Sequence, residues 1–438
     1  MRRSAFGALV LILALTAPAC GRGGGADEGG VPFVQVDPKS ASATDRAIAA
    51  AQTKLRRDDE DADAQLALAQ AFLQKARETA DPTLYSKADT LLGLVAEEAP
   101  DDPRVLVAQG TLLLARHRFA EGLAVGRRAL EVAPGNEAAY GVVVDASNEL
   151  GRYDEAAEAT QHMVDVRPNL ASLSRVSYAR ELHGDLEGAI AAMSQAVTAT
   201  AGSSGENVAY VQVLLGNLLL TRGDLDGAVA AYDAAEQAFP DLPAATAGRA
   251  KVLVARAEYD RAAGVLEELV EVQPLPEYAI ALGDARAAAG DRAGAAEAYE
   301  LVGVIADLYR ANGVDVDLEI ALFDADHDPS PATVAAARRA LEDRPSIVGH
   351  DALAWNLHRT GKDAAASEQM ALALRTGSRD PLLRFHAAAI AAATGDRGAA
   401  TEHLQVVLDS NPRFSAALAD DVEQLARELG LEVPAPGS

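Results

Sequence analysis

Apolar residues recur every three or four positions along most of the chain, in short runs separated by turn residues. In residues 210–240, Gly216 and Leu219 belong to one apolar stripe, and a second stripe follows the turn at Gly223 and Asp224. This spacing is typical of helices that bury one face. The pattern predicts two short helices joined by a tight turn, with the Asp224 carboxylate capping the second helix.

Proline residues set a regular frame for these helix pairs. Pro100, Pro134 and Pro168 recur at a 34-residue interval, and Pro240 and Pro274 repeat that interval. Proline lacks a backbone N–H and has a fixed φ, so each of these residues ends a helix and turns the chain toward the next one. A fixed period of this length indicates tandem repeats that stack into a solenoid.

The small, aromatic and proline positions of the unit resemble, in order, those of the tetratricopeptide repeat (TPR). The match is carried in one unit by Gly110, Phe119, Ala129 and Pro134, and in the next by Gly151, Tyr153, Ala156 and Pro168. The resemblance covers residues 43–430. It implies an all-α fold, a right-handed α-α superhelix of about ten helix-pair repeats.

The expected domain organisation follows from this alignment. The repeats are expected near 62–100, 101–134, 135–168, 169–204, 207–240, 241–274, 275–308, 314–345, 347–378 and 381–412. Each repeat buries its apolar face against neighbours, so the ends need covers, which we assign to capping helices at 44–57 and 414–429. Residues 431–438 are expected to form a disordered tail.

The N-terminus has the features of a targeting segment. Residues 1–19 combine two arginines, a short apolar core at 6–15 and the small-x-small sequence Ala17-Pro18-Ala19. Ordinary cleavage there would release a soluble protein with a free N-terminal thiol. The same bond also resembles a bacterial lipoprotein box, in which the cysteine after the cut is acylated. The only cysteine of the chain, Cys20, stands at that position.

We therefore expect a lipid anchor on Cys20, followed by a flexible Gly-rich tether up to residue 42. Acyl chains on one cysteine would hold the protein at a membrane without a spanning helix. The predicted location is the bacterial cell envelope, on its periplasmic or extracellular face.

Composition narrows the possible functions. The net charge of -26 argues against nucleic acid as a partner, and a single cysteine excludes a disulfide framework and a cysteine-based zinc site. No catalytic motif is recognisable, so no enzyme activity, cofactor or small-molecule substrate is expected. The resemblance to TPR proteins instead implies a scaffold that binds a protein or peptide partner.

In such a scaffold the first helix of each pair lines a concave groove, and its residues off the buried stripe face the ligand. The predicted groove residues are Asp145, Asn148, Tyr178, Tyr210, Asn217, Lys251, Asp351, Trp355, His358, Arg359 and Phe385. Trp355 and Arg359 are of the types that anchor interfaces. The alternative for Trp355 is that it packs between helices, as large aromatic side chains commonly do.

A second hypothesis concerns metal binding. Asp324, Asp326, His327 and Asp328 lie together in the most divergent repeat, at an expected turn that Pro329 closes. Carboxylates and an imidazole could bind a divalent cation, which would suit an accessory lipoprotein of a cation transport system. The competing interpretation is a solvated turn whose acids cap the next helix.

Overall fold

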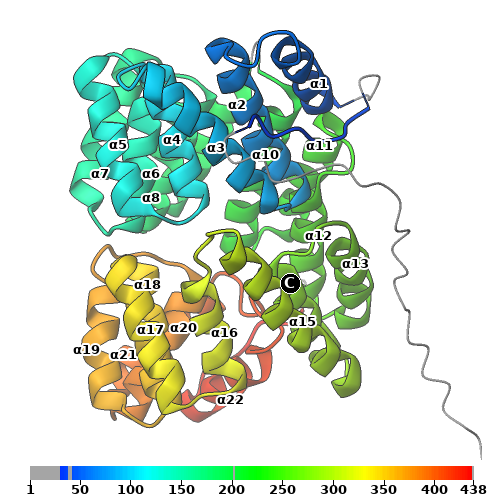
Figure 1. The fold of residues 1–438 in the computed structure, drawn as a ribbon. Coiled ribbons are helices and arrows are strands. Elements are labelled where there is room, and N and C mark those ends of the chain that lie inside the picture. The colour runs from blue at the N-terminus through cyan, green and yellow to red at the C-terminus, as the bar shows by residue number, and fades with distance from the viewer. Residues whose placement is uncertain (1–29, 38–41, 201–202, 437–438) are drawn as a thin grey trace, which may run out of the picture.

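The computed structural model describes residues 30–37, 42–200 and 203–436, and within these ranges the chain forms helices and no strand (Figure 1). The helices are α1 (Ala43–Leu55), α2 (Ala62–Thr79), α3 (Thr83–Glu98), α4 (Pro103–Ala115), α5 (Phe119–Val132), α6 (Glu137–Glu149), α7 (Tyr153–Val166), α8 (Leu170–Leu182), α9 (Leu186–Thr198), α10 (Gly205–Arg222), α11 (Leu225–Ala238), α12 (Pro243–Ala255), α13 (Tyr259–Val272), α14 (Pro276–Ala288), α15 (Arg292–Ala311), α16 (Asp317–His327), α17 (Pro331–Asp343), α18 (Ile347–Arg359), α19 (Asp363–Ala373), α20 (Pro381–Ala393), α21 (Arg397–Leu408) and α22 (Ala419–Leu429).

Local sequence explains how each pair turns. Helix α10 ends at Gly223, whose φ of 89° suits glycine, and the Asp224 carboxylate accepts a hydrogen bond from the Gly227 N–H at 2.9 Å. The predicted cap is therefore confirmed. Gly216 is small where the helices cross, because a Cβ there would overlap the ring of Tyr232.

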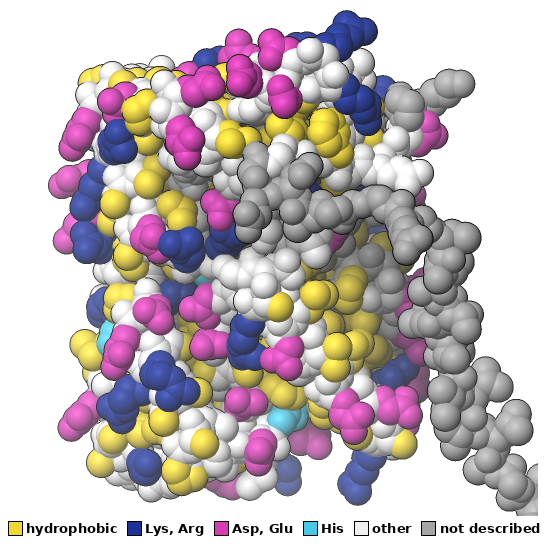
Figure 2. Space-filling view, viewed as in Figure 1, with side chains coloured by type: hydrophobic (Ala, Val, Ile, Leu, Met, Phe, Trp, Pro, Cys, Tyr) yellow, Lys and Arg dark blue, Asp and Glu magenta, His cyan; other side chains and the backbone are white. Residues whose placement is uncertain are grey.

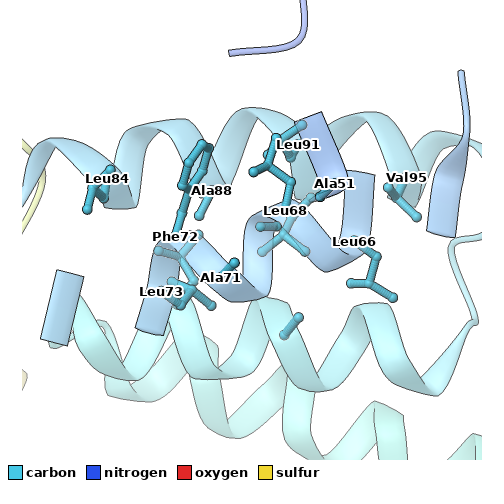
Figure 3. Packing of buried hydrophobic residues seen from close by; sticks show 14 of the residues in the cluster. Ala51, Leu66, Leu68, Ala71, Phe72, Leu73, Leu84, Ala88, Leu91 and Val95 are labelled. Atoms are coloured by element: carbon cyan, nitrogen blue, oxygen red, sulfur yellow. The ribbon is translucent and has the colours of Figure 1, made fainter. Parts of the chain in front are cut away.

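The helices pack as ten consecutive pairs, from α2–α3 to α20–α21, and form an all-α repeat superhelix as predicted. Helix α1 covers the first pair. Its Ile48 and Leu55 are buried with Leu68 and Phe72 of α2 and Leu91 of α3 (Figure 3). Helix α22 packs against the last pair, so both ends of the apolar core are covered.

Two terminal segments differ from expectation. Val31, Val34 and Val36 fall within the expected tether, yet they pack against the core of α1 to α3, and the Val34 N–H donates to the Gln52 side chain at 2.7 Å. At the other end, residues of the expected disordered tail pack against the last helices, and the Pro434 carbonyl accepts a hydrogen bond from Arg413. The valines of the first segment, and Leu431 and Val433 of the second, therefore cover part of the apolar core at each end.

The superhelix completes more than one turn and packs against itself. The turns inside the first five pairs meet the loops that follow the sixth to tenth pairs, so each contact joins elements five pairs apart. In Figure 1, α4 to α8 lie directly above α17 to α21. We call this row of contacts the seam. Its members include Arg77 with Gln273, Arg116 with Asp315, Gly151 with Pro345, Gly184 with Gly377, and Gly223 with Ser410.

Backbone and side-chain hydrogen bonds both hold the seam. The Asp315 N–H donates to the Arg116 carbonyl at 3.2 Å, and the Ile347 N–H donates to the Tyr153 hydroxyl at 2.8 Å. Gly151, at φ 65°, lies so close to the Pro345 carbonyl that a Cβ at this position would overlap its oxygen. Glycine is therefore needed there both for the turn and for the close approach.

Candidate functional site

The inner surface of the superhelix is built by the first helix of each pair. These helices contact one another as well as their own partners, as α4 does with α6, α10 with α12, and α18 with α20. They therefore form the concave side, and the second helices form the outside. The seam places the inner helices of the early pairs opposite those of the late pairs, as the pocket shared by α8, α16, α18 and α20 shows, and we call the region between them the interior.

Two tyrosines on neighbouring first helices face this interior. Tyr178 of α8 and Tyr210 of α10 are 40% and 55% exposed. Protein nevertheless surrounds both hydroxyls, and this burial raises the pKa of each above its ordinary value. Aromatic side chains that remain exposed on a concave surface are suited to contact a ligand.

Charged groups accompany the tyrosines. Arg175 of α8 donates two hydrogen bonds to the Asp145 carboxylate of α6, at 2.8 and 2.6 Å. Lys251 of α12 is exposed to the interior. The protein around its ammonium group nevertheless lowers the pKa of Lys251 by partly excluding water, and the negative charges of Glu277 and Asp380 partly offset this decrease. The interior therefore carries both signs of charge and two accessible aromatic rings.

An acidic pocket of about 240 Å³ lies between α8 and the helices on the other side of the seam. Glu181 of α8 lines it, and burial together with the charge of Asp380 raises the pKa of Glu181 to about 7. Asp380 precedes α20, and burial and the charge of Asp351 raise its pKa as well. Asp351 of α18 is buried and is 2.9 Å from Nδ1 of His386.

Sequence reasoning missed Glu181 and Asp380. Glu181 follows Tyr178 by three residues, so the helical period could have placed both on one face. Nothing local connects Asp380 to Glu181, because the seam brings them together from residues almost 200 positions apart.

Comparison with known protein families identifies the repeat. Two family models, both described as tetratricopeptide repeat, match the chain, one at residues 219–285 and the other at 107–169 and 177–243. The chain is a tetratricopeptide repeat protein. The family supports a role as a protein–protein interaction scaffold.

Several solved structures are similar to this TPR protein. They include a thermophilic TPR protein of Thermus thermophilus at 22% identity, covering 36% of this chain and 84% of that chain with a TM-score of 0.34. A TPR protein from Parabacteroides merdae is 16% identical over 56% of this chain and 98% of that one, with a TM-score of 0.39. PilF of Pseudomonas aeruginosa is 17% identical, with coverages of 49% and 96% and a TM-score of 0.38. Comparison with curated proteins gives no match.

Trp355 and Phe385, two predicted groove residues near the C-terminal end, are buried in the TPR core, which corrects the expectation that they face the groove and agrees with the alternative stated for Trp355. Trp355 is 2% exposed and stacks on His386 with ring centroids 4.0 Å apart, and its Nε1 donates to Asp326 at 2.8 Å. Phe385 is equally buried and contacts Phe414. A first helix packs against its partner and against both neighbouring first helices, so residues beside the buried stripe are also covered.

The remaining predicted groove residues divide into three kinds. Asn148 and Asp351 are buried, so they too depart from the prediction. Asn217 accepts a hydrogen bond from the Tyr232 hydroxyl at 2.8 Å, and His358 is 2.7 Å from Asp363, so both are engaged within their own repeats. Arg359 is exposed, and its guanidinium lies over the Trp355 ring.

The predicted metal-binding residues do not converge on one point. Asp324, Asp326 and His327 lie within α16, which extends further than expected, so the turn begins at Asp328. Asp326 accepts from Trp355, while His327 Nε2 faces Asp284 at 3.3 Å. Within the described residues no group of three or more His, Cys, Asp or Glu side chains is arranged to hold a metal ion.

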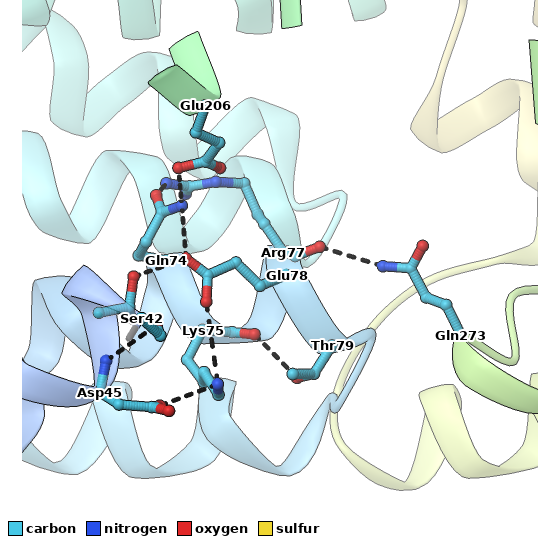
Figure 4. Close-up of polar contacts among 10 residues, drawn as sticks. Ser42, Asp45, Gln74, Lys75, Arg77, Glu78, Thr79, Glu206 and Gln273 are labelled. Atoms are coloured by element: carbon cyan, nitrogen blue, oxygen red, sulfur yellow. Dashed lines mark hydrogen bonds and ion pairs between the residues drawn. The ribbon is translucent and has the colours of Figure 1, made fainter. Parts of the chain in front are cut away.

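A second hollow of about 250 Å³ lies where α2 meets α10 and the loop before α12. Its polar groups contact one another (Figure 4). Gln74 of α2 hydrogen-bonds to Glu206, and Gln273 Nε2 donates to the Arg77 carbonyl at 3.1 Å. The Gln273–Arg77 contact is a member of the seam, so this hollow lies beside the seam.

Figure 2 shows acidic and basic side chains interspersed over one face of the molecule, with apolar groups between them. No helix in the described part of the chain is long and apolar enough to cross a membrane. The predicted signal peptide and Cys20 lie outside the described residues.

Proposed function

We propose that this TPR protein is a lipid-anchored scaffold of the bacterial cell envelope, which binds an extended segment of a partner protein along the interior of its superhelix. The observation that carries the proposal is the pair of accessible rings, Tyr178 and Tyr210, on adjacent inner helices. Charged groups beside them would orient a bound segment. The TPR family, whose members generally act as non-catalytic scaffolds, supports binding rather than chemistry.

The seam affects how a partner could enter. Because the superhelix packs against itself, a folded domain could not reach the inner helices from the side. An extended peptide could pass along the axis, or the seam could open to admit it. We therefore propose an extended or disordered segment as the partner, ordered on binding at the entropic cost such segments carry.

Site-specific photocrosslinking tests this binding mode. A benzophenone amino acid placed at Tyr210 would capture the partner in a native bacterial host, whereas the same group at Val166, an exposed position on the outer helix α7, would not. Tyr178→Ala should weaken capture at position 210. Equal capture from both positions, or none at position 210, would contradict an interior binding site.

The anchor is proposed on separate grounds. The sole cysteine stands at the predicted processing site, and residues 31 to 36 pack on the N-terminal cap eleven residues later. This arrangement would keep the cap of the superhelix near the membrane. Labelling with a fatty-acid analogue should modify the wild-type protein but not Cys20→Ala, which should leave the membrane fraction. A Cys20→Ala variant that remains in the membrane fraction would remove the lipid anchor from the proposal.

A further inference from the structure

The pocket between α8 and α18 is amphipathic. Leu182, Leu322, Ile347 and Val348 supply apolar walls, and three acidic residues also belong to the lining. Its volume of about 240 Å³ is below the ~300–1,000 Å³ typical of cofactor and drug sites. The pocket is therefore matched to one or two side chains of a larger partner.

Of the three carboxylates that line this pocket, Glu181 and Asp380 form no ion pair within the described part of the chain, whereas Asp351 contacts His386. Glu181 forms no hydrogen bond or ion pair through its side chain within the described part of the chain. Asp380 uses Oδ1 to accept from the Leu383 N–H at 3.0 Å, and this bond caps α20. Among the described residues, the lining contains no lysine or arginine.

Neighbouring cations do not fill this role. Lys251 is within electrostatic reach of Asp380, but it forms no ion pair with a described carboxylate. His386 is directed at Asp351, the most buried of the three acids. The lining thus contains two carboxylates without an ion-pair partner among the described residues, Glu181 half-buried and Asp380 exposed, and an incoming positive charge would stabilise both.

We propose that this pocket receives a lysine or arginine side chain of the bound partner segment, with an adjacent apolar side chain against its leucine and valine walls. The proposal rests on the function proposed above and adds the sequence class of the partner. We choose a cationic side chain as the occupant because the described lining contains carboxylates and no lysine or arginine.

The contacts available to such a side chain are specific. Its cationic head would lie between Glu181 and Asp380, forming charge-assisted hydrogen bonds. The exposed ring of Tyr178 lines the same pocket and would contribute a cation–π contact. An aspartate or glutamate in this position would face two like charges, so acidic segments would be rejected.

The bound side chain would also bridge the seam. Glu181 belongs to the fourth helix pair, whereas Asp351 and Asp380 belong to the ninth and tenth. A cation held by both sides would therefore couple partner binding to closure of the superhelix.

Defined peptides test the proposal on the full-length protein. The probe is acetyl-Ala-Leu-Lys-Leu-Ala-amide, with the second leucine replaced by photoleucine, and its controls carry norleucine or glutamate in place of lysine. Titration calorimetry should show the lysine peptide binding at least tenfold more tightly than the norleucine peptide. Crosslinks should map to α8, α18 or α20.

Single substitutions test which carboxylates cause the preference for the lysine peptide. Glu181→Gln and Asp380→Asn should each abolish the preference for lysine, and asparagine would still cap α20. Glu131→Gln changes the net charge equally at an exposed site on α5 and should keep the preference. Helical circular dichroism checks that each variant is folded.

The outcomes separate the two proposals. Equal affinity for lysine and norleucine, an unchanged preference in Glu181→Gln, or no binding of the lysine peptide would overturn the cation pocket. The scaffold would stand in each case if Tyr210 still captured its partner. If position 210 captured no partner while the preference for lysine persisted, the proposal that a segment binds along the interior of the superhelix would be wrong, and the cation pocket would stand.

Discussion

The guanidinium of Arg344 joins the Glu149 carboxylate at 2.7 Å, although the two residues are 195 positions apart in the chain. Arg344 also reaches Glu319 at 2.8 Å, and its side chain is 13% exposed. Glu149 ends α6, and Arg344 follows α17, so this pair closes the seam near its middle. A local repeat contact would not have this separation. This ion pair can therefore form only when the superhelix is closed at the seam.

Removing Arg344 should weaken the seam. We expect Arg344→Met to lower the free energy of unfolding by about 2 to 4 kcal/mol, because two partly buried carboxylates lose their partner. Urea unfolding would measure this loss, and small-angle scattering should show a larger radius of gyration. Arg310→Met removes the exposed pairs with Asp307 and Asp317 and should cost less than about 1 kcal/mol. Equal costs for the two variants would show that Arg344 does not hold the seam.

Glycines in equivalent turns provide a second test of the seam. Gly151 and Gly361 both have positive φ, at 65° and 74°, but a Cβ at Gly361 would meet nothing within 4 Å. Alanine at either position carries a backbone cost of roughly 1 kcal/mol. Gly151→Ala should cost about 1 to 3 kcal/mol more, because its methyl group overlaps the Pro345 carbonyl. Thermal unfolding would report the difference, and its absence would mean that the turn moves freely away from Pro345.

Stability should depend on pH through Glu181. Burial and the charge of Asp380 raise its pKa to about 7, and Tyr178 and Asp351 line the same pocket. The folded protein therefore binds this proton more tightly than the unfolded chain, so stability falls as pH rises from about 4.5 to 7 and is level above that. The Glu181→Gln variant should show a flatter profile, with a gain of about 1 to 3 kcal/mol at pH 8. Parallel slopes for variant and wild type across this range would contradict the raised pKa.

Trp355 should affect stability and not partner binding. Trp355→Phe removes the hydrogen bond to Asp326, whose pKa is raised by burial, and should cost about 1 to 3 kcal/mol. Adding Asp326→Leu should recover part of that loss, since neither polar partner then remains. As the only tryptophan, Trp355 also reports unfolding by a red shift of its emission. Loss of partner capture in a fully folded Trp355→Phe variant would return this residue to the binding surface.

The sequence by itself determined the all-α class, the helix pairs and their turns. Those features depend on contacts between residues a few positions apart, such as the Asp224 cap, the turn at Gly223 and the close fit of Gly216 to Tyr232. Each repeat contains these contacts, so the 34-residue period was enough to reveal them. The same period placed Tyr178 and Tyr210 among the expected groove residues, and both side chains are exposed.

Tertiary structure alone decided what closes the superhelix and what remains accessible inside it. Small rotations between successive repeats accumulate until elements five pairs apart meet. The total rotation cannot be read from any local sequence pattern. The meeting of Glu181 with Asp380, and of Arg344 with Glu149, follows from it. Burial of Trp355 has a related cause, because the packing of three neighbouring first helices covers a face that the helical period alone leaves open.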